Sequence, residues 1–255
     1  MTATENITAP TPTGPRTAVV TGGGTGIGRA TARALALAGY RVVVVGRRKD
    51  VLDEVAADIG GLAVVADLSN VEDVERAARE IVDAVGVVDA LILNAGGAHK
   101  GPLDTVADVA AHWTATMEQN VLSAVLLEHA LRPHLRQPGG RVVVVTSAAA
   151  RSGGGGLAYG SSKAALNRWI LTLASQLGGL GITVNALAPG FVPDTELYEP
   201  GIDPVWLGRV AKGIAVQRVG TPEDIADGIV WLVAPTAGFV SGTVIEIDGG
   251  RAVRV

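Results

Sequence analysis

Residues 17–28 read TAVVTGGGTGIG, an apolar stretch followed directly by a run of glycines. The β-branched residues predict a short buried strand, and the segment after residue 28 predicts a helix. Glycines between a strand and a helix let the backbone turn sharply and approach a ligand. The N–H groups and the positive dipole end of the helix favour a pyrophosphate there. The stretch therefore predicts a dinucleotide-binding unit, against the alternative of a glycine-rich loop without a ligand.

Short apolar runs alternate with longer segments of helical periodicity along the rest of the chain. Such runs are typical of parallel strands that helices cover on both faces. Seven strands are predicted, at residues 18–20, 42–45, 62–66, 90–93, 142–145, 183–187 and 244–247. Helical stripes occupy residues 70–85 and 166–177, and Gly178 with Gly179 ends the second. The pattern predicts an α/β protein with a three-layer, doubly wound, Rossmann-type fold and a seven-stranded parallel sheet.

The composition limits the classes of protein to consider. Hydrophobic residues make up 48% of the 255 residues, charged residues 18%, and mean hydropathy is +0.35, so the chain can bury a large core. No apolar run reaches the roughly 18 residues of a membrane span. The net charge of -4 provides no basic field for a nucleic acid. There is no cysteine and the four histidines lack ligand spacing, so we expect no metal site.

The same pattern predicts how the chain is divided. Residues 1–15 are rich in Thr and Pro and lack the apolar segment of a secretion signal, so we expect a flexible N-terminal tail and a cytoplasmic protein. The continuous alternation predicts one dinucleotide-binding catalytic domain, residues 16–255. Within it, residues 191–217 contain proline, glycine and the bulky side chains of Leu197, Tyr198, Trp206 and Leu207. We expect this segment to be a substrate lid.

The end of the second predicted strand discriminates between NAD and NADP. An NAD site usually has an acidic residue there, bonded to the adenosine ribose 2′-OH. Here Gly46 is followed by Arg47 and Arg48, and no carboxylate at this position opposes a 2′-phosphate. A guanidinium binds a phosphate through two hydrogen bonds, so NADP(H) is predicted in preference to NAD(H). The alternative is that both arginines are ordinary surface residues.

Four polar residues form a candidate catalytic group. Tyr159 and Lys163 lie four residues apart at the start of a predicted helix, so their side chains share a face. A neighbouring ammonium lowers the pKa of a tyrosine from about 10, which suits proton exchange near neutral pH. Ser147 ends the fifth predicted strand, where a hydroxyl can reach a substrate oxygen, and Thr146 competes for that role. Asn120 lies in a predicted helix, either as an ordinary exposed residue or as a water-holding one.

Together these segments resemble the short-chain dehydrogenase/reductase family, in its single-domain branch, from Thr17 to Gly250. The resemblance implies that Tyr159 is the general acid/base, Ser147 orients the carbonyl, and Lys163 holds the nicotinamide ribose and lowers the pKa of Tyr159. It implies that Asn120 anchors a water in a proton relay. The predicted cofactor contacts are Thr21, Gly22, Thr25, Gly26, Ile27, Gly28, Arg47, Arg48, Asp67, Leu68, Asn94, Ala95, Gly96, Tyr159, Lys163, Pro189, Gly190 and Val192.

The resemblance implies an NAD(P)-dependent oxidoreductase that moves a hydride between a nicotinamide and a carbonyl or secondary alcohol. We expect an NADPH-dependent reductase of ketone or 3-oxoacyl-type substrates, or the reverse alcohol dehydrogenase. The alternative is a catalytically idle NADP(H)-binding sensor or partner-binding module on the same fold. In this family the apolar outer faces of the helices at residues 122–135 and 166–177 pack against neighbours, which implies a homotetramer or a homodimer. No nucleic acid or membrane partner is expected.

Overall fold

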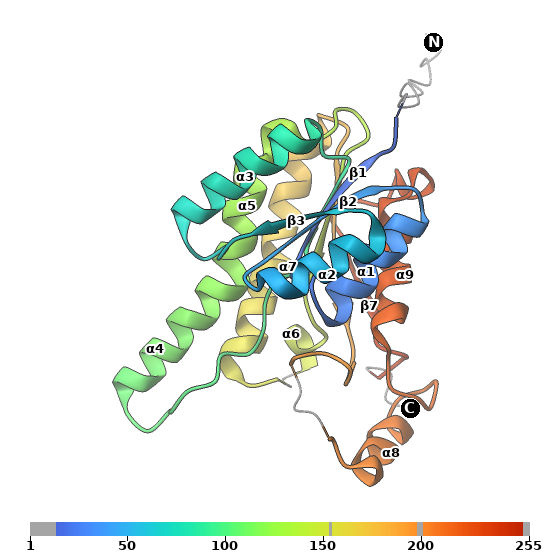
Figure 1. The fold of residues 1–255 in the computed structure, drawn as a ribbon. Coiled ribbons are helices and arrows are strands. Elements are labelled where there is room, and N and C mark those ends of the chain that lie inside the picture. The colour runs from blue at the N-terminus through green and yellow to red at the C-terminus, as the bar shows by residue number, and fades with distance from the viewer. Residues whose placement is uncertain (1–13, 153–154, 198–200, 252–255) are drawn as a thin grey trace, which may run out of the picture.

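The centre of the computed structural model, which describes residues 14–152, 155–197 and 201–251, is a seven-stranded parallel sheet (Figure 1). The strand order is β3-β2-β1-β4-β5-β6-β7. The strands are β1 Thr17–Thr21, β2 Arg41–Gly46, β3 Leu62–Val65, β4 Ala90–Leu93, β5 Arg141–Val145, β6 Thr183–Pro189 and β7 Val244–Ile247. The predicted fold class is confirmed, and each predicted strand is found where the apolar runs indicated.

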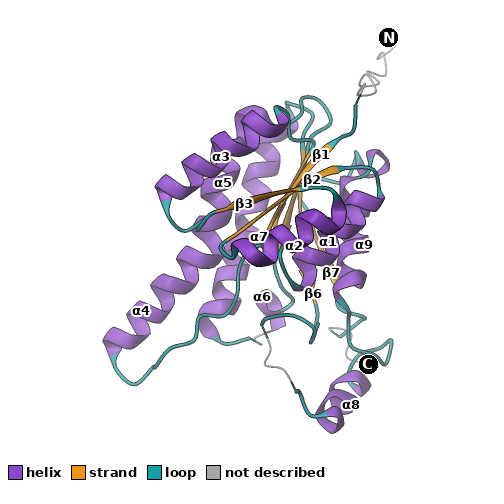
Figure 2. Cartoon of the chain, in the orientation of Figure 1, coloured by secondary structure: helices purple, strands orange, loops and turns teal. Residues whose placement is uncertain are grey.

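Helices connect the strands and surround the sheet, and α8 lies apart from the main layers, beyond the carboxyl ends of the strands (Figure 2). The α-helices are α1 Gly26–Leu37, α2 Lys49–Ile59, α3 Val71–Val85, α4 Val106–Met117, α5 Ser123–Leu131, α6 Ala149–Ser152, α7 Leu157–Gly178, α8 Pro204–Lys212 and α9 Pro222–Val233. A π-helical turn, Glu118–Leu122, joins α4 to α5. The helix expected over residues 122–135 is shorter, because the 3₁₀ turn Arg132–His134, which contains Pro133, follows α5.

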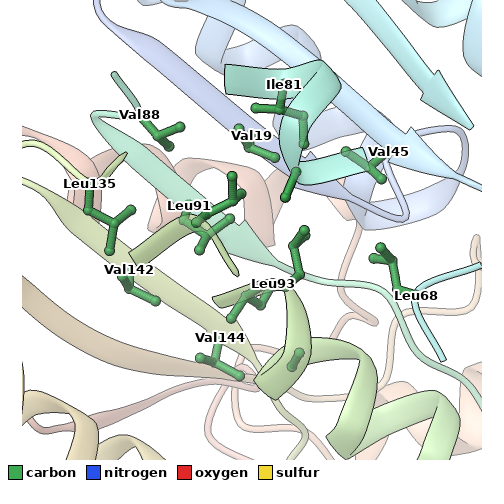
Figure 3. Close-up of a cluster of buried hydrophobic side chains, with 14 of the residues drawn as sticks. Val19, Val45, Leu68, Ile81, Val88, Leu91, Leu93, Leu135, Val142 and Val144 are labelled. Atoms are coloured by element: carbon green, nitrogen blue, oxygen red, sulfur yellow. The ribbon is translucent and has the colours of Figure 1, made fainter. Parts of the chain in front are cut away.

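The two faces of the sheet bury separate apolar clusters, because successive residues of a strand point to opposite sides. On one face, Val19 and Leu91 pack with residues of α3, α5 and α7, and Figure 3 shows part of this cluster. On the other face, Val20 and Ile92 pack with residues of α1, α2 and α9. Figure 1 shows these helices on the two sides. Both layers are therefore held by the continuous apolar strands that the sequence indicated.

The chain reverses its direction of winding between β1 and β4. β1 pairs with β2 on one side and with β4 on the other, so the loops that leave β1 and β4 diverge. In open α/β sheets a crevice forms at such a point, outside the carboxyl ends of the strands, and ligands bind there. The glycine turn follows β1 directly and therefore lies at this crevice.

Two sequence predictions concern residues outside the described ranges. Of the predicted N-terminal tail, only Gly14 and Pro15 lie among the described residues, and Tyr198 of the predicted lid lies outside them. Within the described ranges, no helix combines the length and the hydropathy that crossing a membrane requires.

Candidate active site

A cleft of about 1360 Å³ lies at the carboxyl ends of the strands. Loops that follow β1 to β6 contribute to its wall. It brings together nearly all the predicted site residues, from the glycine turn at one end to Ser147, Tyr159 and Lys163 at the other. Thr21 and Asn120 are the predicted residues that do not line it. One continuous cleft therefore contains both the predicted phosphate turn and the predicted catalytic group.

The glycine turn has the geometry of an anion cradle. Gly22 and Gly26 adopt positive φ angles of 63° and 49°, which side-chain-bearing residues rarely adopt. A Cβ on Gly28 would lie 2.0 Å from the carbonyl oxygen of Gly22, so only glycine fits where α1 meets the turn. Thr25 is the N-cap of α1, yet its side chain makes no capping hydrogen bond and the first turn has no acidic residue. The first N–H groups of α1 are therefore available to an anionic ligand.

Thr21 and Asn94 fix this turn from behind. The Thr21 hydroxyl is buried and accepts hydrogen bonds from the backbone N–H groups of Asn94 (2.9 Å) and Ala95 (2.8 Å). The Asn94 side chain in turn donates from Nδ2 to the Thr21 carbonyl oxygen at 2.9 Å. These bonds join the end of β1 to the segment after β4. Thr21 therefore positions the cleft wall from a buried site, rather than facing the cleft as the sequence predicted.

The two arginines after β2 are exposed and line the cleft. Gly46, the last residue of β2, lines the cleft beside them and adds no side chain there. Arg48 Nη2 lies 2.6 Å from Glu196 Oε1, in the segment that follows β6. In the described part of the chain, no ion pair is formed by Arg47.

Asp67 and Leu68 follow β3 on the same side of the cleft. Asp67 Oδ1 accepts hydrogen bonds from the backbone N–H of Ser69 (3.0 Å) and from its hydroxyl (2.6 Å). These two bonds, with a smaller contribution from the charge of Arg47, hold the pKa of the Asp67 carboxyl below its usual value. Asp67 is therefore an ionised acceptor beside the buried side chain of Leu68, which suits an adenine ring.

Tyr159 and Lys163 lie together on the inward face of α7. Both side chains are buried, and Lys163 Nζ is 5.8 Å from the centroid of the Tyr159 ring, as expected for positions one helical turn apart. Lys163 Nζ donates to the carbonyl oxygen of Val145, the last residue of β5, at 3.1 Å. Burial lowers the pKa of Lys163 to about 8. The ammonium is thus held at the carboxyl end of the sheet, beside the phenol.

Asn120 is buried within the π-helical turn, and both ends of its side chain bond to the protein. Its Oδ1 accepts from the N–H of Gly97 at 2.7 Å, and its Nδ2 donates to the Gly97 carbonyl oxygen at 3.0 Å. Nδ2 also lies 2.9 Å from Ser162 Oγ, which donates to the carbonyl oxygen of Tyr159 at 2.7 Å. Asn120 therefore connects the segment after β4 to the first turn of α7.

Gly96 marks the point where Asn120 approaches Lys163. A Cβ on Gly96 would lie 2.6 Å from Asn120 Oδ1 and 3.1 Å from Lys163 Nζ. The two side chains are therefore near neighbours, although Asn120 does not line the cleft itself. A glycine is needed here because any side chain would fill the space between them.

The two hydroxyls after β5 differ in their surroundings. Ser147 is only partly buried, and its Oγ accepts from the backbone N–H of Ala149 at 3.1 Å. Thr146 is 2% exposed, and its Oγ1 faces the carbonyl oxygen of Leu187 at 3.4 Å. Both residues line the cleft. Ser147 is the more accessible of the two.

The segment after β6 closes the other side of the cleft. Pro189, at the end of β6, and Gly190 and the buried Val192 after it line the cleft; their contact with a nicotinamide remains a prediction. A Cβ on Gly190 would lie 2.6 Å from Asp248 Cα, so the chain can pass the end of β7 only with glycine at this position. Among the described residues, no cluster of acidic and histidine side chains is arranged to hold a metal ion.

The family follows from comparison with known proteins. Residues 22–252 match the protein family described as enoyl-(acyl carrier protein) reductase. The chain belongs to the short-chain dehydrogenase/reductase family. It is thus an oxidoreductase that acts on CH–OH or C=O groups with NAD(P), and the predicted family is confirmed.

Several relatives of this short-chain dehydrogenase/reductase span nearly its whole length. The short-chain reductase protein NovJ of Streptomyces niveus is 37% identical over 245 residues, which cover 92% of this chain and 93% of NovJ. The 7alpha-hydroxysteroid dehydrogenase of Escherichia coli K12 is 32% identical over 91% of this chain and 92% of its own. The solved structure of the RhlG/NADP active-site complex of Pseudomonas aeruginosa superposes with a TM-score of 0.86 and 32% identity, over 94% and 98% of the two chains.

In this short-chain dehydrogenase/reductase, further cleft residues were not predicted from the sequence. The polar ones among them include His99, Gln119, Arg151, Glu246 and Arg251. Arg151 Nη2 and Glu246 Oε2 form an ion pair of 2.6 Å between α6 and β7. A charged residue, Glu246, inside the otherwise apolar run of residues 244–247 is a signal in the sequence that could have indicated this contact.

Proposed function

We propose that this protein is an NADPH-dependent carbonyl reductase of ketone or 3-oxoacyl-type substrates. The same site would also catalyse the reverse reaction, the oxidation of a secondary alcohol. The observation that carries the proposal is the placement of Tyr159 and Lys163 in the same cleft as the glycine turn. Hydride transfer to a carbonyl needs a proton donor beside the nicotinamide. A phenol next to a buried ammonium meets that need.

The residues present fit a dinucleotide. The glycine turn, with Gly22, Thr25, Gly26, Ile27 and Gly28, offers uncapped N–H groups to the diphosphate. Arg47 and Arg48 would hold the 2′-phosphate, and Asp67 and Leu68 the adenine. Asn94, Ala95 and Gly96 would contact the adenosine ribose, and Pro189, Gly190 and Val192 the nicotinamide side. The NADP in the RhlG complex supports the preference for NADP(H).

The four catalytic residues have distinct proposed roles. Bound NADPH supplies the hydride. Tyr159 gives its phenolic proton to the substrate oxygen, and Ser147 donates a hydrogen bond that orients the same oxygen. Lys163 binds the nicotinamide ribose and, as an ammonium, favours the phenolate that remains. Asn120 holds the segment after β4 against α7. We also propose that it anchors a water molecule of the proton relay.

Ser147 is preferred to Thr146 for the carbonyl role. Its hydroxyl is partly exposed, whereas the Thr146 hydroxyl is buried against a backbone carbonyl. The competing function, a catalytically idle NADP(H) sensor, leaves unexplained why a phenol and a buried ammonium would be kept together at the end of a cofactor cleft. Burying an ammonium is costly. A binding module would gain the ribose contact of Lys163, but it would gain nothing from the phenol of Tyr159 placed beside that ammonium.

The remaining parts of the proposal concern the whole chain. We propose one catalytic domain over residues 16–255, with a substrate lid near residues 191–217 that includes Trp206, whose ring lies 5.4 Å from that of Phe191. A small carbonyl or alcohol is the substrate, and a homotetramer or homodimer is the assembly. The cytoplasmic location remains a prediction.

Replacing Tyr159 by Phe tests the function. The rate of NADPH oxidation should fall by about 10²- to 10⁴-fold, because the proton donor is removed, while NADPH binding measured by fluorescence titration should persist. Ketones, 3-oxoacyl thioesters and oxosteroids form the substrate panel. Tyr40→Phe removes a phenol outside the cleft, where it donates to the carbonyl of Val233, and should keep the rate. A Tyr159→Phe enzyme as fast as the wild type would refute the role, and NADPH binding without turnover of any substrate would favour the sensor.

A further inference from the structure

The segment after β6 returns across the cofactor end of the cleft. Thr195 lies against the glycine turn, since a Cβ on Gly26 would be 3.2 Å from Thr195 Cγ2. Its neighbour Glu196 lines the same cleft. A carboxylate is thus placed beside the site proposed for the adenosine phosphates, where a further negative charge is unfavourable for an anionic ligand.

Glu196 is bonded to one of the two arginines proposed to bind the 2′-phosphate. Its Oε1 accepts from Arg48 Nη2 at 2.6 Å, across 148 residues of sequence. Arg48, two residues after β2, is the N-cap residue of α2, and Arg47 before it forms no ion pair of this kind among the described residues. The two arginines are therefore not equivalent: Arg47 acts on the Asp67 carboxylate through its charge only, whereas Arg48 donates a hydrogen bond directly to a carboxylate.

A carboxylate and a phosphate are alternative ligands for the same guanidinium donors. The side chains of Arg48 and Glu196 are 54% and 59% exposed, so water and salt screen their ion pair and its net strength is small. A dianionic phosphate at this position would attract Arg48 more strongly and would repel the carboxylate. The pair is therefore exchangeable, and its exchange depends on whether the cofactor has a 2′-phosphate.

We propose that Glu196 is a cofactor-specificity residue that competes with the 2′-phosphate of NADP(H) for Arg48. The competition weakens the preference for NADP(H) over NAD(H) that Arg47 and Arg48 would otherwise give. NAD(H) has a hydroxyl at this position and leaves the pair intact. The inference rests on the proposed function, because it assumes that the dinucleotide lies in this cleft.

The experiment measures dissociation constants of NADP⁺, NAD⁺ and 2′,5′-ADP by isothermal titration calorimetry. Glu196→Gln keeps the size of the side chain and removes its charge. NADP⁺ and 2′,5′-ADP should then bind about threefold to tenfold more tightly, whereas the dissociation constant of NAD⁺ should stay the same. The matched control is Asp194→Asn, which removes the same charge two residues away, where no ion pair to Arg48 is present within the described ranges. It should have less effect on the NADP⁺/NAD⁺ affinity ratio.

A second variant isolates the competition. In an Arg48→Gln background, Glu196→Gln should no longer tighten NADP⁺ binding, because the contested guanidinium is absent. In 0.5 M NaCl the gain in NADP⁺ affinity from Glu196→Gln should shrink. At this salt concentration the Debye length is roughly 4 Å, so the exposed charges are strongly screened. An NADP⁺/NAD⁺ affinity ratio that is unchanged in Glu196→Gln would overturn the inference. Equal weakening of the binding of both cofactors would overturn it too, because the ion pair would then support the whole dinucleotide. A wild-type protein that binds no dinucleotide would instead refute the proposed function.

Discussion

The Lys163 ammonium is the buried charge on which the proposed chemistry depends. Its side chain is buried, and its described hydrogen bond goes to the neutral carbonyl of Val145 rather than to a carboxylate. An unneutralised ammonium in such a place loses hydration that a carbonyl replaces only in part. Burial lowers its pKa from 10.5 to about 8 for this reason. The site therefore has a cost in folding stability, which has a definite pH dependence.

Lys163→Met tests this cost. Because the pKa of Lys163 is lower in the folded protein than in the unfolded chain, the unfolded chain binds more protons between pH 8 and pH 10.5. The free energy of unfolding of the wild type therefore rises with pH across that interval, and the variant lacks this rise because it has no lysine at this position. The difference between wild type and variant should therefore move in favour of the wild type by about 2 kcal/mol between pH 7.5 and pH 10. Urea unfolding at several pH values measures it.

The control for that series is Lys212→Met on α8, where the lysine is exposed and no buried charge is removed. Its unfolding free energy should follow that of the wild type across the same pH range. A Lys163→Met difference that stays constant from pH 7.5 to pH 10 would contradict the burial cost.

At the scale of elements, the start of α1 and the glycine turn form one unit. Gly28 lies in the first turn of α1, directly against the backbone of Gly22. The Thr25 side chain does not cap the N-terminus of the helix, so the protein lacks the stabilisation that a cap would give. The same N–H groups are therefore available to a ligand. The proposed binding of a diphosphate by helix, turn and strand β1 therefore requires the backbone to keep this close approach.

Gly28→Ala should break the unit. The added Cβ would lie 2.0 Å from the Gly22 carbonyl oxygen. Neither atom can move away by rotating a side chain, so the backbone of the turn must move. We expect the free energy of unfolding to fall by about 1–3 kcal/mol and dinucleotide binding to be lost. Gly208→Ala in α8, where a Cβ would meet nothing within 4 Å, is the control, and should keep both properties. A Gly28→Ala protein that binds NADP⁺ normally would show that the turn does not hold the diphosphate.

At the scale of the whole molecule, large apolar side chains remain exposed on the helices that the resemblance assigns to subunit contacts. Leu122, in the π-helical turn, is 43% exposed, and Leu171 on α7 is 46% exposed. Trp113, on α4, which packs against α7, is 37% exposed. Such surface is typical of interfaces between subunits. It supports the proposed homotetramer or homodimer.

The double change Leu122→Glu and Leu171→Glu should dissociate the assembly, because like charges would face each other across a symmetric interface. Light scattering on the wild type should give a multiple of the 25.9-kDa chain mass, and on the variant a smaller species. Leu37→Glu on α1, where the leucine is 91% exposed, should leave the mass unchanged. A wild-type monomer at working concentration would count against the proposal.

The sequence by itself determined the features that arise from neighbouring residues. Unbroken β-branched runs such as residues 42–45 can be stable only as strands covered on both faces, so the sheet and its layers were predictable. The glycine turn follows β1 directly, and Tyr159 and Lys163 are one helical turn apart. Their proximity needed no knowledge of the rest of the fold.

Only the tertiary structure decided contacts between distant segments. The Arg48–Glu196 pair, the link from Asn120 to Gly97, and the burial of Thr21 against the segment after β4 have no periodic signal in the sequence. The π-helical turn that holds Asn120 likewise differs from an α-helix by a single hydrogen-bond register, which side-chain patterning does not record. Such features form when loops meet at the carboxyl edge of the sheet, because strand order and loop closure, rather than local preference, bring them together.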